Sequence, residues 1–439
     1  MDYNKKAGTN HLKRIASILL CVSLLSGAVG CTNTDSASSN DTAAVSQSGS
    51  TKETASYDTS AQYEATVLKD GDSITGGTYS ATGNDESALE ASGSVNATVT
   101  GAVIQKTAGN ASSAGAASFR GVNSGVRVYG NADVTLTDCN IEASAKNATG
   151  VFAYENGVIH ISNCTVNVTG GGAGGVQVAG GGTLIGSNLT VTSASKAAIR
   201  SDRGGGTLTL DGGTYTSTGS DGCPAIYSTA DITVKNAVCT STNSRAVIIE
   251  GKNSVTLENC TVTGNGYLTK NSKAGSVAGN VMLYQSASGD AAKGTSVFTM
   301  TGGTLTAQAG TMFYCTNISS VINLNDVKLV YSEEGTLLIA AAGRWGKEGR
   351  NGGKCVFNAT NQTLKGNIIV DSISSLTLNL TDSSFTGAIQ NDGTADVVMD
   401  AGSTWKLTGD SSVSSLSGDT SGIDLNGFTL LVGGKAFSR

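Results

Sequence analysis

Hydrophobic and polar residues alternate along short segments that recur through most of this chain. The segments "ADVTLTDCNI", "GVIHISNCTV", "GTLTLDGGTY" and "NSVTLENCTV" each contain an alternating stretch, a polar corner and a further apolar residue. Alternation with a period of two predicts strands that bury one face. Their first apolar residues recur at intervals of 23 to 25, which predicts one structural unit per interval. These residues are Val134, Ile159, Leu184, Leu208, Ile232 and Val255, with longer spacing at Phe298 and Phe357.

One position in each unit is always Asn, Asp or Gly. Because these residues tolerate a left-handed backbone, the column predicts one tight turn in every unit. We also expect stacked Asn side chains to bond to one another along the column. The column consists of Asp138, Asn163, Asn188, Gly212, Asn236, Asn259, Gly302 and Asp326.

A second strand precedes each of these segments, with variable loops between. Strands that recur once per coil predict an all-β solenoid in which each rung pairs in parallel with the next. The irregular period argues against a left-handed hexapeptide helix, whose coil length is strict. The first apolar residues of this second strand are Val151, Val176, Ile199, Ile226, Val247, Val281 and Met312.

These repeats resemble the right-handed parallel β-helix superfamily typified by pectate lyases. They are more closely similar to the β-helical surface lipoproteins of bacteria described as adhesin-like. The resemblance covers residues 74–405 as architecture. It implies a right-handed parallel β-helix, which we place at residues 69–405, followed by the last coils and a cap at 406–439.

The N-terminus has the features of an export signal. A basic segment, "MDYNKKAGTNHLKR", precedes the apolar "IASILLCVSLLSGAVGC", which is short for a bilayer span. Its ending resembles a bacterial lipobox, which predicts a signal peptide at 1–30 and a lipid on Cys31. The alternative is an ordinary cleaved signal with a chance Cys. Residues 31–68 lack apolar periodicity and are predicted to form a disordered tether holding the folded body on the outer side of the cell membrane.

Composition agrees with this fold and excludes several function classes. The 439 residues include 59 Gly and 1 Pro, and 14% are charged, which favours strands and tight turns over helices. The net charge of -6, without basic clusters after the signal, argues against nucleic acid as a partner. The chain has 2 His, and His11 lies in the signal, so a His-rich metal site or a Ser/His/Asp triad has little support.

Seven of the nine Cys remain after Cys21 and Cys31 are assigned to the signal and the lipid. Cys139, Cys164 and Cys260 follow the corner position and fall in one inward column. Cys packs as a small hydrophobe and no C-x-x-C pair exists, so we expect buried thiols rather than disulfides or a metal site.

The stretch "AAIRSDRGGG" places charges on the outside of the coil. Alternation directs Ile199 and Ser201 inward, and Arg200 and Asp202 outward. Since adjacent rungs lie about 4.8 Å apart, outward positions form continuous columns. We call the two columns beside Arg200 and Asp202 the outer stripe and expect it to face solvent. Its predicted members are Arg127, Phe152, Gln177, Arg200, Tyr227, Ile248, Met282 and Phe313, and then Tyr129, Tyr154, Ala179, Asp202, Thr229, Glu250 and Tyr284.

Two interpretations of the outer stripe remain open. In the first, aromatic faces stack on sugar rings while charged side chains bind hydroxyls or a uronate or sialate carboxylate. The ligand-binding residues would be Phe152, Tyr154, Arg200, Asp202, Arg203, Tyr227, Glu250 and Tyr284. In the second, an inserted loop, such as 266–294, covers the aromatic residues. The basic insertion at 343–354 is a ligand loop or a linker between rungs.

The resemblance also implies an enzymatic alternative, a polysaccharide lyase or glycoside hydrolase. Arg200, Arg203 or Lys252 would act as the base of a lyase, and Asp202 and Glu250 as the carboxylates of a hydrolase. The Asp cluster that holds calcium in the lyases is missing from this face, so no metal or other cofactor is expected. We therefore expect an exported, lipid-anchored surface protein that binds an extracellular polysaccharide or host glycan, with catalysis or a spacer role without ligand as the alternatives.

Overall fold

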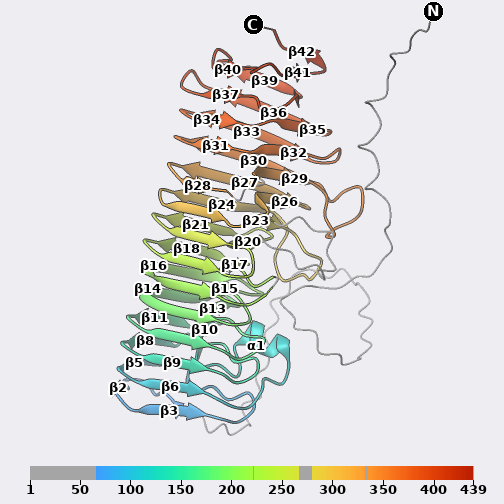
Figure 1. The fold of residues 1–439 in the computed structure, drawn as a ribbon. Helices are drawn as coiled ribbons and strands as arrows, with labels where there is room; N and C mark the ends of the chain where they lie inside the picture. The colour runs from blue at the N-terminus through green and yellow to red at the C-terminus, as the bar shows by residue number, and fades with distance from the viewer. Residues whose placement is uncertain (1–65, 221, 266–278, 332–334, 439) are drawn as a thin grey trace, which may run out of the picture.

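Parallel strands stack along one axis into an elongated solenoid (Figure 1). This computed structural model describes residues 66–220, 222–265, 279–331 and 335–438. The predicted signal peptide, Cys31 and almost all of the predicted tether lie outside the described residues. The solenoid begins at Thr66, and Leu68 is buried in its core, so three residues assigned to the tether belong to the folded body.

Each coil contributes one strand to a first sheet. Within the described residues this sheet contains thirteen strands, all paired in parallel. They are β1 (Thr66–Val67), β4 (Leu89–Ser92), β7 (Val126–Tyr129), β10 (Val151–Tyr154), β13 (Val176–Ala179), β15 (Ile199–Ser201), β17 (Ile226–Ser228), β20 (Val247–Glu250), β23 (Gly279–Tyr284), β26 (Thr311–Thr316), β29 (Thr336–Ala340), β32 (Asn367–Val370) and β35 (Ile389–Asn391).

A second sheet forms the rest of the coil in two arms that meet at the polar corner. The first arm contains β2 (Ser73–Thr75), β5 (Asn96–Thr100), β8 (Asp133–Thr137), β11 (Val158–Ser162), β14 (Gly182–Ser193), β16 (Gly206–Ser217), β18 (Asp231–Lys235), β21 (Ser254–Glu258), β24 (Thr295–Thr301), β27 (Ile318–Asn325), β30 (Gly353–Thr360), β33 (Ser375–Thr381), β36 (Thr394–Met399) and β39 (Ser415–Gly418). The second contains β3 (Thr78–Ala81), β6 (Val103–Lys106), β9 (Asn140–Ala143), β12 (Thr165–Val168), β19 (Val238–Ser241), β22 (Thr261–Gly264), β25 (Thr304–Ala307) and β28 (Lys328–Val330), and β14 and β16 run through both arms.

The last coils carry two smaller sheets and a terminal hairpin. One sheet contains β31 (Thr363–Lys365), β34 (Ser384–Thr386), β37 (Thr404–Lys406) and β40 (Ile423–Asp424). The other contains β38 (Ser411–Val413), β41 (Leu430–Val432) and β42 (Lys435–Ala436), and here β42 turns back antiparallel to β41. The hairpin closes a solenoid end whose strand edges would otherwise stay open.

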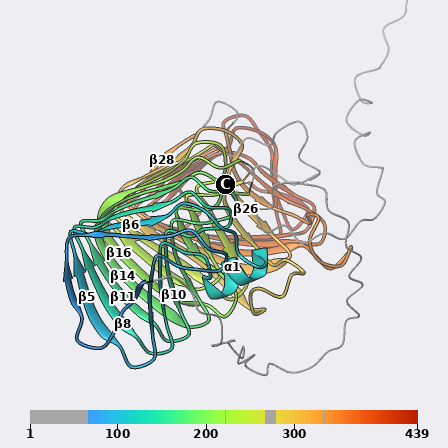
Figure 2. The ribbon, with the colours of Figure 1, turned by 90° about the horizontal axis from the view of Figure 1, so that it is seen from below.

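The core is one continuous column of apolar side chains inside the coil. Viewed end-on, the strands enclose this interior, and the helix α1 (Ala114–Arg120) lies outside it (Figure 2). The predicted alignment of Val134, Ile159 and Leu184 is confirmed, because these residues pair in register on β8, β11 and β14 and are fully buried. The register continues to Phe298 and Phe357 on the later coils.

The strands predicted to precede each alternating segment form this first sheet. Their predicted alignment is confirmed from Val151 to Val281 and is wrong at Met312. Val281 pairs with Phe313, whose ring packs in the core 5.4 Å from that of Phe357. Tyr314, rather than Phe313, therefore continues the outward column beside Met282. All six residues of β26 are buried, so both of its faces are covered. The pattern of apolar residues therefore does not reveal which of them point inward.

The predicted left-handed corners are confirmed. Every member of the column has a positive φ, from 50° at Asn236 to 70° at Gly212. Most of the corner N–H groups donate to the next coil, as from Asn163 to the Ser187 carbonyl at 3.0 Å. The Asn ladder that the structure shows lies elsewhere, on β27, β30 and β33, where Asn358 donates to Asn323 at 2.8 Å and Asn379 to Asn358 at 2.7 Å.

Candidate ligand-binding face

Apart from Phe313, which lies in the core, the outer stripe lies on the outer face of the first sheet in the predicted register. Phe152 pairs with Gln177, Gln177 with Arg200, and Arg200 with Tyr227 on successive rungs. Glu250 pairs with Tyr284. The predicted orientation is confirmed, since Ile199 lies in the core and Arg200 points away from it. The topology therefore brings the predicted residues together on one face.

The predicted exposure of the outer stripe is wrong for most of its members. The exposed fraction is 3% for Arg200, 2% for Asp202 and 1% for Glu250. Phe152, Tyr227 and Tyr284 are buried as well. The physical reason is that three segments outside the coil, which we call the roof, cover the sheet. The interpretation with aromatic residues packed beneath a covering segment is the one that the structure supports.

The first roof segment is α1 with its flanking loop. Ser113 caps the helix by accepting a hydrogen bond from the Ala116 N–H, and Gly121 ends it in the left-handed conformation. The Ser118 carbonyl accepts from Gln177 Nε2 at 2.9 Å, and the Ser118 hydroxyl contacts Lys196 Nζ at 2.5 Å. These bonds fix the helix over the side chains of the earlier coils.

The second roof segment, residues 285–292, covers Glu250. The Glu250 carboxylate accepts hydrogen bonds from Tyr227 at 2.5 Å and from Tyr284 at 2.9 Å. The hydroxyls of Ser286 and Ser288, from the roof, also bond to it. Burial, with the neighbouring Tyr284 and Glu250 groups, raises the pKa of Tyr227 well above its usual value. The part of the predicted covering loop at 266–278 lies outside the described residues.

The third roof segment is the basic insertion at residues 343–352. The Trp345 ring packs 4.8 Å from the ring of Tyr284, and the Arg344 guanidinium lies 4.5 Å from the centre of the Trp345 ring. Burial lowers the pKa of Arg344. Asn351 Nδ2 donates to the Gly343 carbonyl at 2.7 Å and so closes the loop. The insertion is therefore a cover for the first sheet.

Arg200 and Asp202 form an ion pair inside this covered layer. Arg200 Nε donates to Asp202 Oδ2 at 2.8 Å, and Gln177 Nε2 donates to the same oxygen at 3.1 Å. The guanidinium carbon of Arg200 lies 4.6 Å from the centre of the Tyr227 ring. The pair thus binds coils to one another beneath the roof. A carbohydrate arriving from solvent meets neither charge in this conformation.

Comparison with known proteins supports the fold. The family model for the right-handed beta helix region matches residues 124–281. Together with the parallel sheets, this match decides the fold class. The chain is a right-handed parallel β-helix. No curated protein and no solved structure matches the chain. The matched part of the β-helix spans nearly the whole outer stripe but ends before the third roof segment.

Four of the predicted residues on this face of the β-helix remain accessible, and we call them the open margin. Tyr129 and Tyr154 are half-buried, and Arg203 and Lys252 are exposed. Sequence analysis missed two residues that hold this margin in place, because they lie far from it in the chain. Glu90 accepts from the Tyr129 hydroxyl at 3.0 Å. Asp290 accepts from Arg203 Nη2 at 2.8 Å.

The electrostatics of the open margin come from neighbouring charges. Burial, together with the Glu90 carboxylate, raises the pKa of Tyr129, so the phenol stays neutral and its hydroxyl donates a hydrogen bond to Glu90. The Arg127 guanidinium lies 4.0 Å from the centre of the Tyr129 ring and presses against one face. The Arg203 guanidinium likewise lies 4.3 Å from the centre of the Phe119 ring on α1. Tyr129 and Arg203 are thus held by fixed partners.

The cysteines of the β-helix are buried thiols, as predicted. Every Cys in the described residues is free and buried. The Cys139 N–H lies 3.2 Å from Cys164 Sγ on the next coil, which confirms the inward stack. Burial raises the pKa of the Cys239 thiol well above its usual value. The described residues hold no group of three His, Cys, Asp or Glu side chains arranged to bind a metal.

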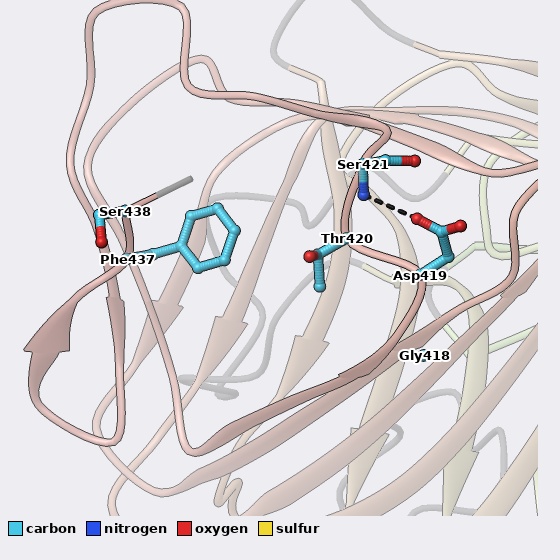
Figure 3. Close-up of a pocket in the computed structure, with 6 residues that line it drawn as sticks. All are labelled: Gly418, Asp419, Thr420, Ser421, Phe437 and Ser438. Carbon is cyan, nitrogen blue, oxygen red and sulfur yellow. Dashed lines mark hydrogen bonds between the residues drawn. The ribbon is translucent and has the colours of Figure 1, made fainter.

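The C-terminal end of the β-helix carries an open hollow of about 790 Å³. Its lining consists of Gly418, Asp419, Thr420, Ser421, Phe437 and Ser438. Figure 3 shows the Phe437 ring facing Thr420, with Asp419 beyond it. Sequence analysis did not single out these residues, because the hollow depends on where the terminal hairpin folds back. Among the described residues, no helix combines the length and apolar character needed to cross a membrane.

Proposed function

We propose that this β-helix is an exported surface protein that binds extracellular glycans through its open margin. The basic and apolar N-terminal segments and the lipobox-like Ala28-Val29-Gly30-Cys31 support export and a lipid on Cys31. The long polar stretch that follows supports a tether between the membrane and the folded body. By binding glycans from the cell surface, the protein would mediate adhesion.

The observation that carries this proposal is the pair of accessible tyrosines. Tyr129 and Tyr154 lie directly opposite each other on β7 and β10, about one rung apart. Two aromatic rings about one rung apart on the same face would provide neighbouring apolar surfaces for the C–H face of a sugar. Because Arg127 and Glu90 hold Tyr129, the surface is preorganised and little entropy is lost on binding.

The cations of the open margin favour acidic sugars. Arg203 and Lys252 are exposed, whereas Arg200 is committed to Asp202. An exposed guanidinium forms two-pronged hydrogen bonds with the carboxylate of a uronate or sialate. Arg203 would have to exchange its Asp290 partner for the ligand carboxylate. The lyase or hydrolase alternative stays a prediction, and Arg203 and Lys252 are the two candidate catalytic residues that a substrate would reach.

A glycan array tests the proposal. The purified body, residues 66–439, is applied beside Tyr154→Ala, Arg203→Ala and the matched control Tyr79→Ala. Tyr79 is also a half-buried tyrosine, but it lies on β3 at the end of the second sheet. We expect binding to acidic glycans that falls at least about tenfold in Tyr154→Ala and Arg203→Ala and is unchanged in Tyr79→Ala.

Binding to no glycan would contradict the proposal and favour the spacer alternative. Equal losses in Tyr154→Ala and Tyr79→Ala would also contradict it, because the effect would then come from the fold. Incubation with polyuronates, followed by ultraviolet absorbance of unsaturated products, examines the lyase alternative. Product formation that Lys252→Ala or Arg203→Ala abolishes would replace simple binding with catalysis.

A further inference from the structure

The hollow at the C-terminal end differs from the covered face because it opens directly to solvent. The strands that lead into it, β39 and β42, lie at the opposite end of the solenoid from β2 (Figure 1). Two short segments form it: the turn after β39 and the residues after β42. Gly418 adopts a φ of 84°, which only Gly reaches without strain, and this turn brings Asp419, Thr420 and Ser421 to the rim.

The lining combines an aromatic ring with a carboxylate and hydroxyls. Phe437 supplies the ring, and Thr420, Ser421 and Ser438 supply the hydroxyls. Asp419 Oδ1 accepts the Ser421 N–H at 2.8 Å (Figure 3). A carboxylate offers about four acceptor positions, so Asp419 keeps acceptor capacity for a ligand. Aromatic and polar groups in one open concavity are typical of carbohydrate sites.

The charge of the hollow is negative. Hydrogen bonds from Ser421 lower the pKa of Asp419, so this side chain is an anion at neutral pH. Among the described lining residues, Asp419 is the one with a formal charge. A uronate or sialate carboxylate would be repelled here, whereas an ammonium group would be attracted. The hollow therefore has the opposite preference to the open margin, with its exposed Arg203.

We propose that the hollow binds an amino-sugar residue with a protonated amine, of the glucosamine type. The proposal rests on glycan binding as the function of the protein and adds a second site of different selectivity. The ring of Phe437 packs on the C–H face of the sugar, Asp419 accepts from the ammonium group, and the hydroxyls of Thr420 and Ser438 bond to sugar hydroxyls. With the lipid at the N-terminus, this site would lie at the end farthest from the membrane.

Calorimetric titration with the hexamer of glucosamine tests this site, and the hexamer of N-acetylglucosamine serves as the uncharged comparison. The protein variants are Asp419→Asn, Phe437→Ala and the control Phe428→Ala. Phe428 is exposed near the same end but does not line the hollow. We expect the wild type to bind the glucosamine hexamer at least about tenfold more tightly than the acetylated one, since a charged hydrogen bond is lost on acetylation. Asp419→Asn should abolish this preference, and Phe437→Ala should weaken binding of the glucosamine hexamer while Phe428→Ala leaves it unchanged.

The outcomes separate this inference from the proposed function. Equal binding of the two hexamers, no binding of either, or full binding by Asp419→Asn would each overturn the inference. If acidic glycans still bind and Tyr154→Ala still weakens them, the proposed function survives that failure. Tyr154→Ala should bind the glucosamine hexamer like the wild type, and a loss there would place the amino sugar on the open margin instead. Thermal unfolding of each variant checks that Asp419→Asn and Phe437→Ala remain folded.

Discussion

Buried charges on the first sheet are stabilised by specific partners on neighbouring coils. Arg200 and Asp202 bond to each other, and Gln177 from the preceding coil completes the coordination of the carboxylate. Such a pair contributes little net stability against an apolar replacement, but removal of one partner leaves a buried charge. The role of this pair is therefore better measured by stability than by binding.

Replacement of Arg200 by Ala is expected to destabilise the fold strongly. The change leaves the buried Asp202 carboxylate without its cation and bonded to Gln177, so the free energy of unfolding should fall by about 3–5 kcal/mol. Arg203→Ala is the matched control, because Arg203 is exposed and its ion pair should contribute no more than about 1 kcal/mol. Urea unfolding followed by circular dichroism measures both. Similar values for the two variants would contradict a structural role for Arg200.

Prediction from sequence succeeded for single residues where the backbone conformation restricts which residue types can occupy the position. The column from Asp138 to Asp326 was recognisable because Asn, Asp and Gly adopt the left-handed turn at low cost. It failed where burial depends on distant segments. The alternation correctly placed Arg200 on the outer face of the coil. It did not reveal that the roof separates this face from solvent.

At the scale of the elements, the corner turn joins the two arms of the second sheet in every coil. Asn163 has a φ of 53° and its N–H bonds to the next coil. We expect Asn163→Ala to lower the free energy of unfolding by about 1 kcal/mol, because Ala adopts this conformation with strain. Asn163→Gly should change the free energy of unfolding by no more than a few tenths of this amount, because Gly adopts the left-handed conformation without strain.

Asn167 provides the matched control for this corner. It is an exposed Asn as well, but it lies in the extended strand β12. Asn167→Ala should leave stability within about 0.5 kcal/mol of the wild type, as surface substitutions usually do. Urea unfolding of the three variants gives the comparison. If Asn163→Gly proves as damaging as Asn163→Ala, side-chain contacts rather than the turn conformation determine the choice of Asn.

The strands were predictable from sequence, and the roof was not. A two-residue period identifies strands and their inward faces, so the registers from Val134 to Phe357 follow from it. The roof has no such period, because α1 is a helix of only 7 residues and residues 285–292 and 343–352 are irregular. One signal was present, since Phe152, Ile248 and Met282 are apolar at outward positions. Solvent-facing columns seldom carry so many large apolar side chains, which indicates a cover.

On the scale of the whole molecule, the solenoid separates its two ends by the full stack of coils. Each coil contacts chiefly the coils before and after it, so the N-terminal coils near β1 and the C-terminal hollow do not share contacts. Sites at the two ends can therefore be altered independently. The proposed anchor at one end, with the accessible hollow at the other, would make a protein that presents its far end outward.

The proposed lipid on Cys31 would determine whether this geometry applies on the cell. Cys31→Ser should remove the acylation site, so the exported protein should move from the membrane fraction to the soluble fraction. Membrane and soluble fractions from cells expressing each form, compared by immunoblot, measure the shift, and incorporation of a labelled fatty acid reports the lipid directly. Cys139→Ser is the control, because Cys139 is a buried thiol in the core and carries no lipid. If the Cys31→Ser protein stays with the membrane, or if the wild type incorporates no fatty acid, another contact holds the β-helix there. The C-terminal hollow would then lose its predicted outermost position, although its preference for an amino sugar would be unaffected, because that preference depends on Asp419 and Phe437 alone.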